Sequence, residues 1–121
     1  MQQLCYALPI EPGKIDAARA FGADLAGTRR EEHAAFQRRT GIMRESWYLQ
    51  RTAHGHLLLL YLESHDLHHT LQALATPGGP YDRWFKARVA EIVGVDVRDA
   101  LSRPGPEHLF SCEVPQLQLP V

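Results

Sequence analysis

The chain has 121 residues, the usual size of one domain, so a second independent hydrophobic core is not expected. Hydrophobic residues make up 45% and charged residues 22%, a balance that excludes an intrinsically disordered chain. The formal net charge of -1, from 13 Lys and Arg against 14 Asp and Glu, leaves no overall positive field to attract nucleic acid or anionic lipid.

Membrane insertion and export are not expected either. No apolar run approaches the roughly 20 residues that span a bilayer, and the first residues lack the features of a signal peptide. We therefore predict a cytoplasmic protein with no membrane partner. Cys5 and Cys112 lie far apart in the sequence and in no metal-ligand spacing, so both are expected to remain free thiols in a reducing compartment.

The chain begins with a strand followed by a helix. Residues 4–8 form a short apolar run stopped by Pro9, the profile of a buried strand that ends in a turn. From Lys14 the period changes, which predicts an amphipathic helix. Its apolar positions are Ile15, Ala18, Phe21, Gly22 and Leu25.

A second helical segment is expected directly afterwards. Thr28 and Glu31 have the spacing of a capping box, which predicts that residues 29–39 form a second, kinked portion of the helix. Gly41 is placed where a glycine commonly ends a helix.

The middle of the chain predicts a β-hairpin. Residues 43–52 and 56–63 are rich in strand formers and are separated by a short loop that contains Gly55. Residues 57–62 are apolar on both faces of the strand, so both sides of the sheet must be covered. Helices can cover one side only, and we expect the same sheet of a second subunit to cover the other, giving a homodimer.

The last part of the chain predicts two helices and a strand. Leu67, Leu71 and Leu74 are spaced as in a short helix. Tyr81, Phe85, Val89 and Ile92 are spaced as in a second helix, which Gly94 ends. Residues 98–107 are typical of a loop, and residues 108–114 predict a last strand.

The predicted order is therefore strand, helix, strand, strand, helix, strand. This is the βαββαβ plan of an α+β, ferredoxin-like domain with an antiparallel sheet. We place this domain at residues 1–114 and a C-terminal tail at residues 115–121.

Several segments resemble a known group of proteins. They are Trp47-x-x-Gln50, Gly55, Leu59-x-Tyr61-x-Glu63-x-x-Asp66, and Pro80-Tyr81-Asp82-Arg83-Trp84-Phe85. Across roughly residues 4–97 the chain resembles uncharacterised small bacterial proteins of the dimeric α/β-barrel superfamily, which includes the antibiotic biosynthesis monooxygenases. That superfamily also contains haem-degrading enzymes, lactone isomerases and members without known chemistry. The resemblance implies a ligand cavity between the sheet and the helices, and the monooxygenase branch requires no cofactor.

The candidate site lies on the hairpin and on the segment around residue 82. Trp47, Tyr61 and Glu63 could line a pocket in which Glu63 and Tyr61 handle a proton. Alternatively, the two aromatic residues stabilise the core or the dimer, and Glu63 pairs with an arginine. The further candidate ligand contacts are Gln50, Asp82, Trp84, Phe85 and His68.

Two of these candidates, Asp82 and His68, also have ordinary structural explanations. Asp82 could border the cavity or cap a helix. His65, His68 and His69 have a spacing that allows a metal or haem site, although polar residues are common in the first turn of a helix. We predict no metal site.

The sequence thus indicates a small-molecule-binding protein or a cofactor-independent, monooxygenase-like enzyme. The alternatives are a non-catalytic dimeric protein and a haem-binding protein that uses one histidine. The sequence contains no nucleotide-binding glycine pattern, GxSxG or HExxH motif, so dehydrogenases, serine hydrolases and zinc proteases have no support.

Overall fold

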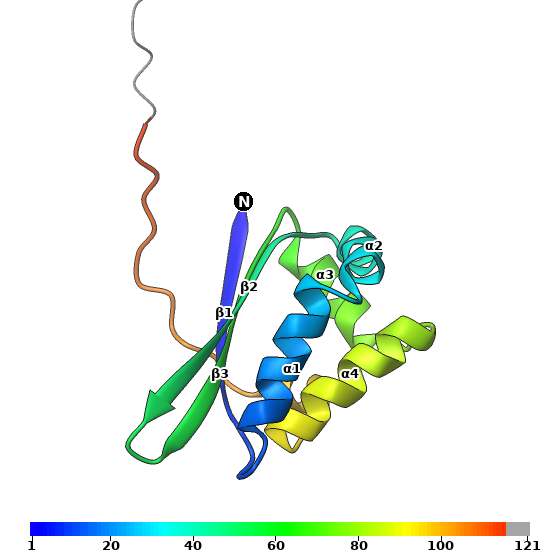
Figure 1. The fold of residues 1–121 in the computed structure, drawn as a ribbon. Coiled ribbons are helices and arrows are strands. Elements are labelled where there is room, and N and C mark those ends of the chain that lie inside the picture. The colour runs from blue at the N-terminus through cyan, green and yellow to red at the C-terminus, as the bar shows by residue number, and fades with distance from the viewer. Residues whose placement is uncertain (116–121) are drawn as a thin grey trace, which may run out of the picture.

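The structure is a computed structural model that describes residues 1–115 (Figure 1). Its elements are β1 (Gln2–Pro9), α1 (Ile15–Ala26), α2 (Arg30–Thr40), β2 (Ile42–Thr52), β3 (Gly55–Ser64), α3 (Leu67–Ala75), α4 (Pro80–Val93) and α5 (Val97–Ser102). No helix among these residues is long and apolar enough to cross a membrane.

The three strands form one antiparallel sheet in the order β1-β3-β2. In the central strand, residues 58, 60, 62 and 64 are buried and the residues between them are only half-buried. Helices α1 to α4 lie on one side of the sheet, as Figure 1 shows. The sheet therefore has an inner face, which packs on the helices, and an outer face, which the helices leave uncovered.

The core between the sheet and the helices is rich in aromatic side chains. Phe21 of α1 and Phe36 of α2 are almost fully buried beside Leu62 of β3 and Ile92 of α4. The ring centres of Phe36 and Phe85 lie 4.8 Å apart. The apolar stripes predicted for these helices thus face the inner side of the sheet.

The start of α2 differs from the predicted capping box. The N-cap residue is Arg29, whose side chain makes no capping hydrogen bond. Thr28 lies one residue too early, and its hydroxyl donates to the Asp24 carboxylate at 3.1 Å instead. Gly41 ends α2 in the left-handed conformation, with φ 79°, as its position predicts.

The segment after α4 contains a helix where a loop was predicted. Asp96 accepts a hydrogen bond from the Arg98 backbone N–H at 2.7 Å and so caps α5. Val97 and Ala100 are buried against the rest of the core. This single apolar side of a six-residue helix is too short to produce a periodic pattern.

The predicted last strand, residues 108–114, is not formed. The chain after α5 passes along β1, where Ser111 Oγ donates to Gln3 Oε1 at 3.1 Å, but it makes no strand ladder. Pro104 and Pro106 lack a backbone N–H, and the preceding Pro- and Gly-containing stretch leads the chain past the sheet edge without pairing. Of the predicted tail at residues 115–121, all but residue 115 lies outside the described residues.

Both cysteines are free and exposed. Because residues 108–114 form no strand, Cys112 does not lie on a strand next to that of Cys5.

Candidate functional site

The strand register separates the residues that were predicted to share a pocket. Tyr61 lies opposite Cys5 and Ser46 on the outer face of the sheet. Glu63 has the same parity as Tyr61, and Gln50 lies opposite Leu57, so both are on the outer face as well. Trp47 lies opposite Leu60, on the inner face. The structure therefore does not bring Trp47 together with Tyr61 and Glu63.

The inner face brings other predicted residues together. Phe85 is buried in the core, and its ring centre lies 6.3 Å from that of Trp47. Trp84 is half-buried, with the Arg29 guanidinium stacked 4.2 Å above its ring. Phe21 contacts all three aromatic residues.

The remaining predicted residues lie apart from this cluster. Asp82 is buried in the first turn of α4 and pairs with Arg39, whose Nη2 lies 3.0 Å from Asp82 Oδ1. His68 is exposed on α3. Among residues 1–115, no group of three His, Cys, Asp or Glu side chains is arranged to hold a metal ion.

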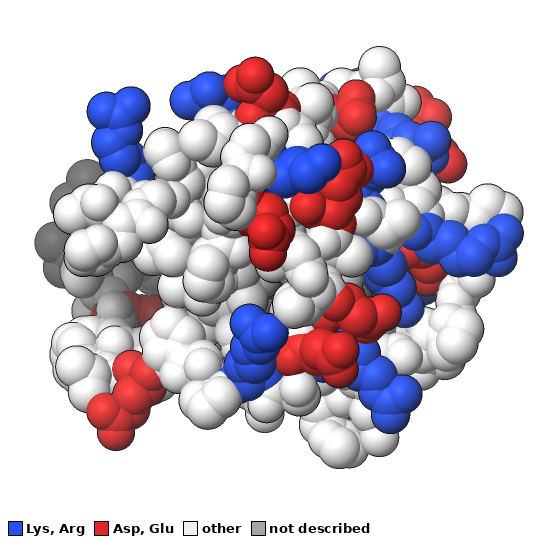
Figure 2. Space-filling model, turned by 90° about the horizontal axis from the view of Figure 1, so that it is seen from below, with Lys and Arg blue, Asp and Glu red and all other residues white. Residues whose placement is uncertain are grey.

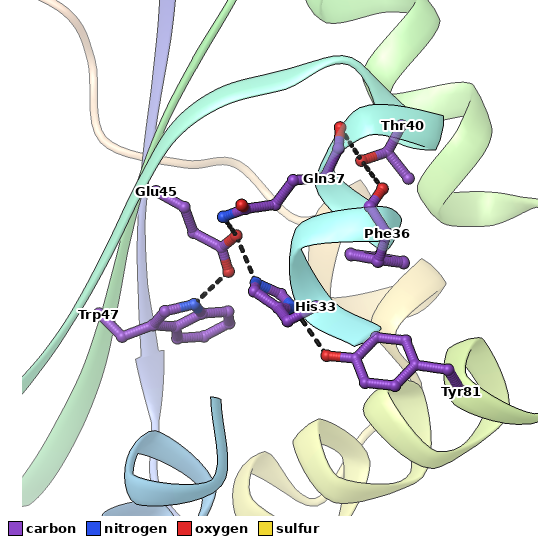
Figure 3. A network of polar contacts seen from close by, with 7 residues as sticks. All are labelled: His33, Phe36, Gln37, Thr40, Glu45, Trp47 and Tyr81. Atoms are coloured by element: carbon purple, nitrogen blue, oxygen red, sulfur yellow. Dashed lines mark hydrogen bonds and ion pairs between the residues drawn. The ribbon is translucent and has the colours of Figure 1, made fainter. Parts of the chain in front are cut away.

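A buried polar network occupies the space between α2, α4 and β2 (Figure 3). His33 Nδ1 lies 2.6 Å from Tyr81 Oη, and His33 Nε2 lies 2.7 Å from Glu45 Oε1. Gln37 donates to Glu45 Oε1 at 2.9 Å, and the Trp47 indole donates to Glu45 Oε2 at 2.6 Å. The Glu45 side chain is only 3% exposed and that of His33 only 8%. A carboxylate is thus enclosed in the core by three partners.

The protonation states of this network follow from its environment. Burial raises the pKa of Glu45, but the contacts with His33, and then with Trp47 and Gln37, outweigh burial and lower it. Burial and the nearby charge of Glu45 raise the pKa of Tyr81. Donors and acceptors match when Tyr81 donates to His33 Nδ1 and His33 Nε2–H donates to ionised Glu45. The Tyr81 hydroxyl, the His33 imidazole and the Glu45 carboxylate thus form a chain of hydrogen bonds.

One acceptor position of the Glu45 carboxylate has no protein partner among residues 1–115. A carboxylate has about four lone-pair positions, two on each oxygen. Glu45 Oε1 accepts from His33 and Gln37, whereas Oε2 accepts from Trp47 alone among the described residues. Glu45 Oε2 can therefore accept one more hydrogen bond or a proton.

An open cleft of about 310 Å³ borders this carboxylate. Its lining combines small and apolar residues of α1 with the network: Gly22, Leu25, Ala26, His33, Gln37, Glu45 and Trp47. A second, apolar cavity of about 30 Å³ lies deeper in the core and shares Glu45 and Trp47 with the cleft. The deeper cavity has room for water-sized molecules only, so the cleft is the space that an organic ligand can enter.

Sequence reasoning missed His33 and Glu45 as site residues. Glu45 shares its strand face with Trp47, and this alternation was the available signal. His33 precedes Phe36 by three residues and so lies on the buried side of α2. His33 directly follows four charged residues, 29–32, so its buried position was not expected.

The comparisons with known proteins support the fold. No protein-family model and no curated protein matches the chain. Among solved structures, the chain is similar to tetracenomycin F2 cyclase from Streptomyces glaucescens, described as a type-II polyketide cyclase. The TM-score is 0.57 at 17% sequence identity, over 95% of this chain and 100% of that one. The expected α+β, ferredoxin-like fold is confirmed. At this identity the likeness concerns the fold alone.

Proposed function

We propose that the protein binds a small organic ligand in the cleft between α1, α2 and β2 and moves a proton on it. The observation that carries this proposal is Glu45, a buried and ionised carboxylate with an unused acceptor position at the border of the cleft. A ligand hydroxyl or N–H group can donate to Glu45 Oε2, or Oε2 can take the proton as a general base.

The other residues of the cleft define the shape of the ligand. Trp47 provides a flat aromatic wall. Gly22 and Ala26 are small and leave room for a ligand in the cleft. These features favour a planar, largely apolar ligand with one polar group. The similar fold of a polyketide cyclase supports an organic substrate of this kind.

Proton removal is the step that we propose. It can begin a ring closure, and it can equally begin a cofactor-independent oxygenation. His33 would act as a positioning residue, because its Nε2–H fixes Glu45 Oε1 while Tyr81 fixes the imidazole ring.

A second candidate site lies on the outer face. Tyr61 borders a hollow of about 500 Å³ between β1, β3 and the segment at residues 105–110. Burial and the neighbouring Glu63 raise the pKa of Tyr61. Tyr61 and Glu63 therefore remain the proposed proton-handling pair of this alternative site.

We also propose a homodimer formed through the outer face. Leu57 and Leu59 are half-buried there without helix cover, and Tyr48 is 58% exposed. Light scattering at micromolar concentration should give the mass of a dimer, whereas a well-behaved monomer would contradict this proposal.

Two matched variants decide between the sites. We would screen planar phenols, beginning with 2-naphthol, by the change in melting temperature of the parent protein, Glu45→Gln and Glu63→Gln. If the cleft is the site, Glu45→Gln loses the ligand-induced shift and Glu63→Gln keeps it. The reverse pattern would move the site to the outer face. No shift with any ligand for the parent would favour the non-catalytic dimeric protein.

A further inference from the structure

A second hollow, of about 390 Å³, lies between the end of α3 and the beginnings of α4 and α5. It shares no residue with the cleft. Its polar lining consists of Arg83, Lys86, Arg98 and Asp96. Its base is formed by Leu74, Ala75, Pro77 and Gly78.

The charge around this hollow is unbalanced. Among the described residues, no carboxylate lies within 4.0 Å of the side-chain nitrogens of Arg83, Lys86 or Arg98. The other arginine of α4, Arg88, lies 2.9 Å from Glu91 and is thereby neutralised. Three cations thus face one hollow with a single carboxylate on its border.

That carboxylate is already engaged. Asp96 Oδ1 accepts the backbone N–H of Arg98 at 2.7 Å, in the cap of α5. This contact keeps Asp96 at the helix end, and no ion pair joins it to the three cations.

Two of the cations make exposed contacts with backbone oxygens. Lys86 Nζ donates to the Thr76 carbonyl at 2.6 Å, and Arg83 Nη1 lies 3.4 Å from the Gly78 carbonyl. Each contact uses one of the three ammonium hydrogens or one of the five guanidinium hydrogens, so most donors stay available. Tethered donors lose less freedom when they bind a ligand.

The distribution of charge can be followed on one face of the molecule in Figure 2. On the face drawn in Figure 2, basic and acidic groups alternate and no large patch has a single sign. Such a surface does not attract an extended polyanion, in agreement with the net charge of -1. In the hollow, three cations face a single carboxylate, and its volume of about 390 Å³ suits a small molecule.

We propose that this hollow binds the anionic group of a small molecule, a carboxylate or a phosphate. Arg83 and Arg98 would bind the anion through paired guanidinium N–H groups, and Lys86 would contribute a point charge. The proposal depends on no residue of the cleft.

The test is a titration of the ¹⁵N-labelled protein at low ionic strength, followed by amide chemical shifts. Inorganic phosphate and citrate serve as probes for the two anion chemistries, and sodium chloride at equal ionic strength is the control. We expect saturable shifts at the amides of Gly78 and Asp96 with at least one probe. Saturation by phosphate alone identifies a phosphate site, and saturation by citrate alone identifies a carboxylate site.

Charge-removing variants test the location. Arg83→Gln and Arg98→Gln should each weaken binding about fivefold to tenfold. Arg88→Gln removes the same charge from the same helix outside the hollow and should leave binding unchanged. Shifts that sodium chloride reproduces, or equal weakening by all three variants, would show general charge screening and would overturn the proposal.

Discussion

The substitution Glu45→Gln tests whether the hydrogen-bond donors and acceptors of the buried network match one another. The amide keeps one acceptor oxygen and replaces the other by an NH₂ donor. If the oxygen takes the place of Oε1, it still accepts from His33 and Gln37, but the new NH₂ meets the Trp47 indole N–H. The opposite orientation keeps only the contact with Trp47. The first orientation should prevail, because it preserves two of the three hydrogen bonds.

The expected loss of stability follows from this count. A buried donor left without a partner costs about 1–3 kcal/mol, and the remaining two bonds become weaker when the carboxylate charge is lost. We therefore expect Glu45→Gln to lower the free energy of unfolding by about 2–3 kcal/mol. Glu45→Ala removes all three acceptor contacts and should cost more, about 3–5 kcal/mol. Both losses are within the 5–15 kcal/mol by which a typical domain is stable.

Urea unfolding measures the difference. The fluorescence of Trp47 and Trp84 reports the transition, because both are half-buried and pack against the core. Glu63→Gln, on the outer face, is the matched control and should change the free energy of unfolding by less than about 1 kcal/mol. A Glu45→Gln protein within about 0.5 kcal/mol of the parent would refute the hydrogen-bond count.

Three further measurements test other parts of the structure. The lowered pKa of Glu45 means that its contribution to stability is present above the ordinary carboxyl pKa, about 4.3, and is lost as the pH falls towards the folded-state value. The parent should therefore lose more stability than Glu45→Gln between about pH 5 and pH 3, and parallel curves would contradict this. Mass spectrometry without reductant should find Cys5 and Cys112 as free thiols; a quantitative disulfide would refute this prediction. Tyr6→Phe removes the 2.7 Å hydrogen bond to the Leu101 carbonyl and should cost about 0.5–1.5 kcal/mol and speed amide exchange in α5, so unchanged exchange would count against it.

Much of the fold could be predicted because long elements carry strong patterns. The apolar run of β3 predicted a strand, and the helical spacing around Phe21 and Phe85 predicted the inward sides of α1 and α4. Gly41 and Gly94 ended their helices as expected, since both have positive φ.

The C-terminal part could not be predicted in the same way. Residues 108–114 contain apolar residues at strand-like density, yet Leu109 and Phe110 are 86% and 79% exposed. Strand formation depends on a partner edge at the right distance, which local composition does not report. Helix α5 depends on the Asp96 cap and on burial against elements distant in sequence.

Which residues share the candidate site is determined by the register of the strands. Alternation alone established that Tyr61 and Glu63 share one face and that Glu45 and Trp47 share one face, but not whether the two faces coincide. The pairing of Trp47 with Leu60 decides this question, and it places the two groups on opposite sides of the sheet. The separation of Trp47 from Tyr61 is thus a property of the hairpin alignment, which the residue types do not specify.

The position of the polar network also argues for a role beyond stability. His33 packs against the rings of Phe36 and Phe85, in surroundings that would accept an apolar side chain. Burying a hydrogen-bonded carboxylate generally stabilises a protein no more than well-packed apolar residues of similar size. Among the described residues, Glu45 Oε2 accepts from Trp47 alone, which leaves one of its acceptor positions without a protein partner. At the border of an open cleft, the same position is available to a ligand, which supports the proposed ligand binding at Glu45.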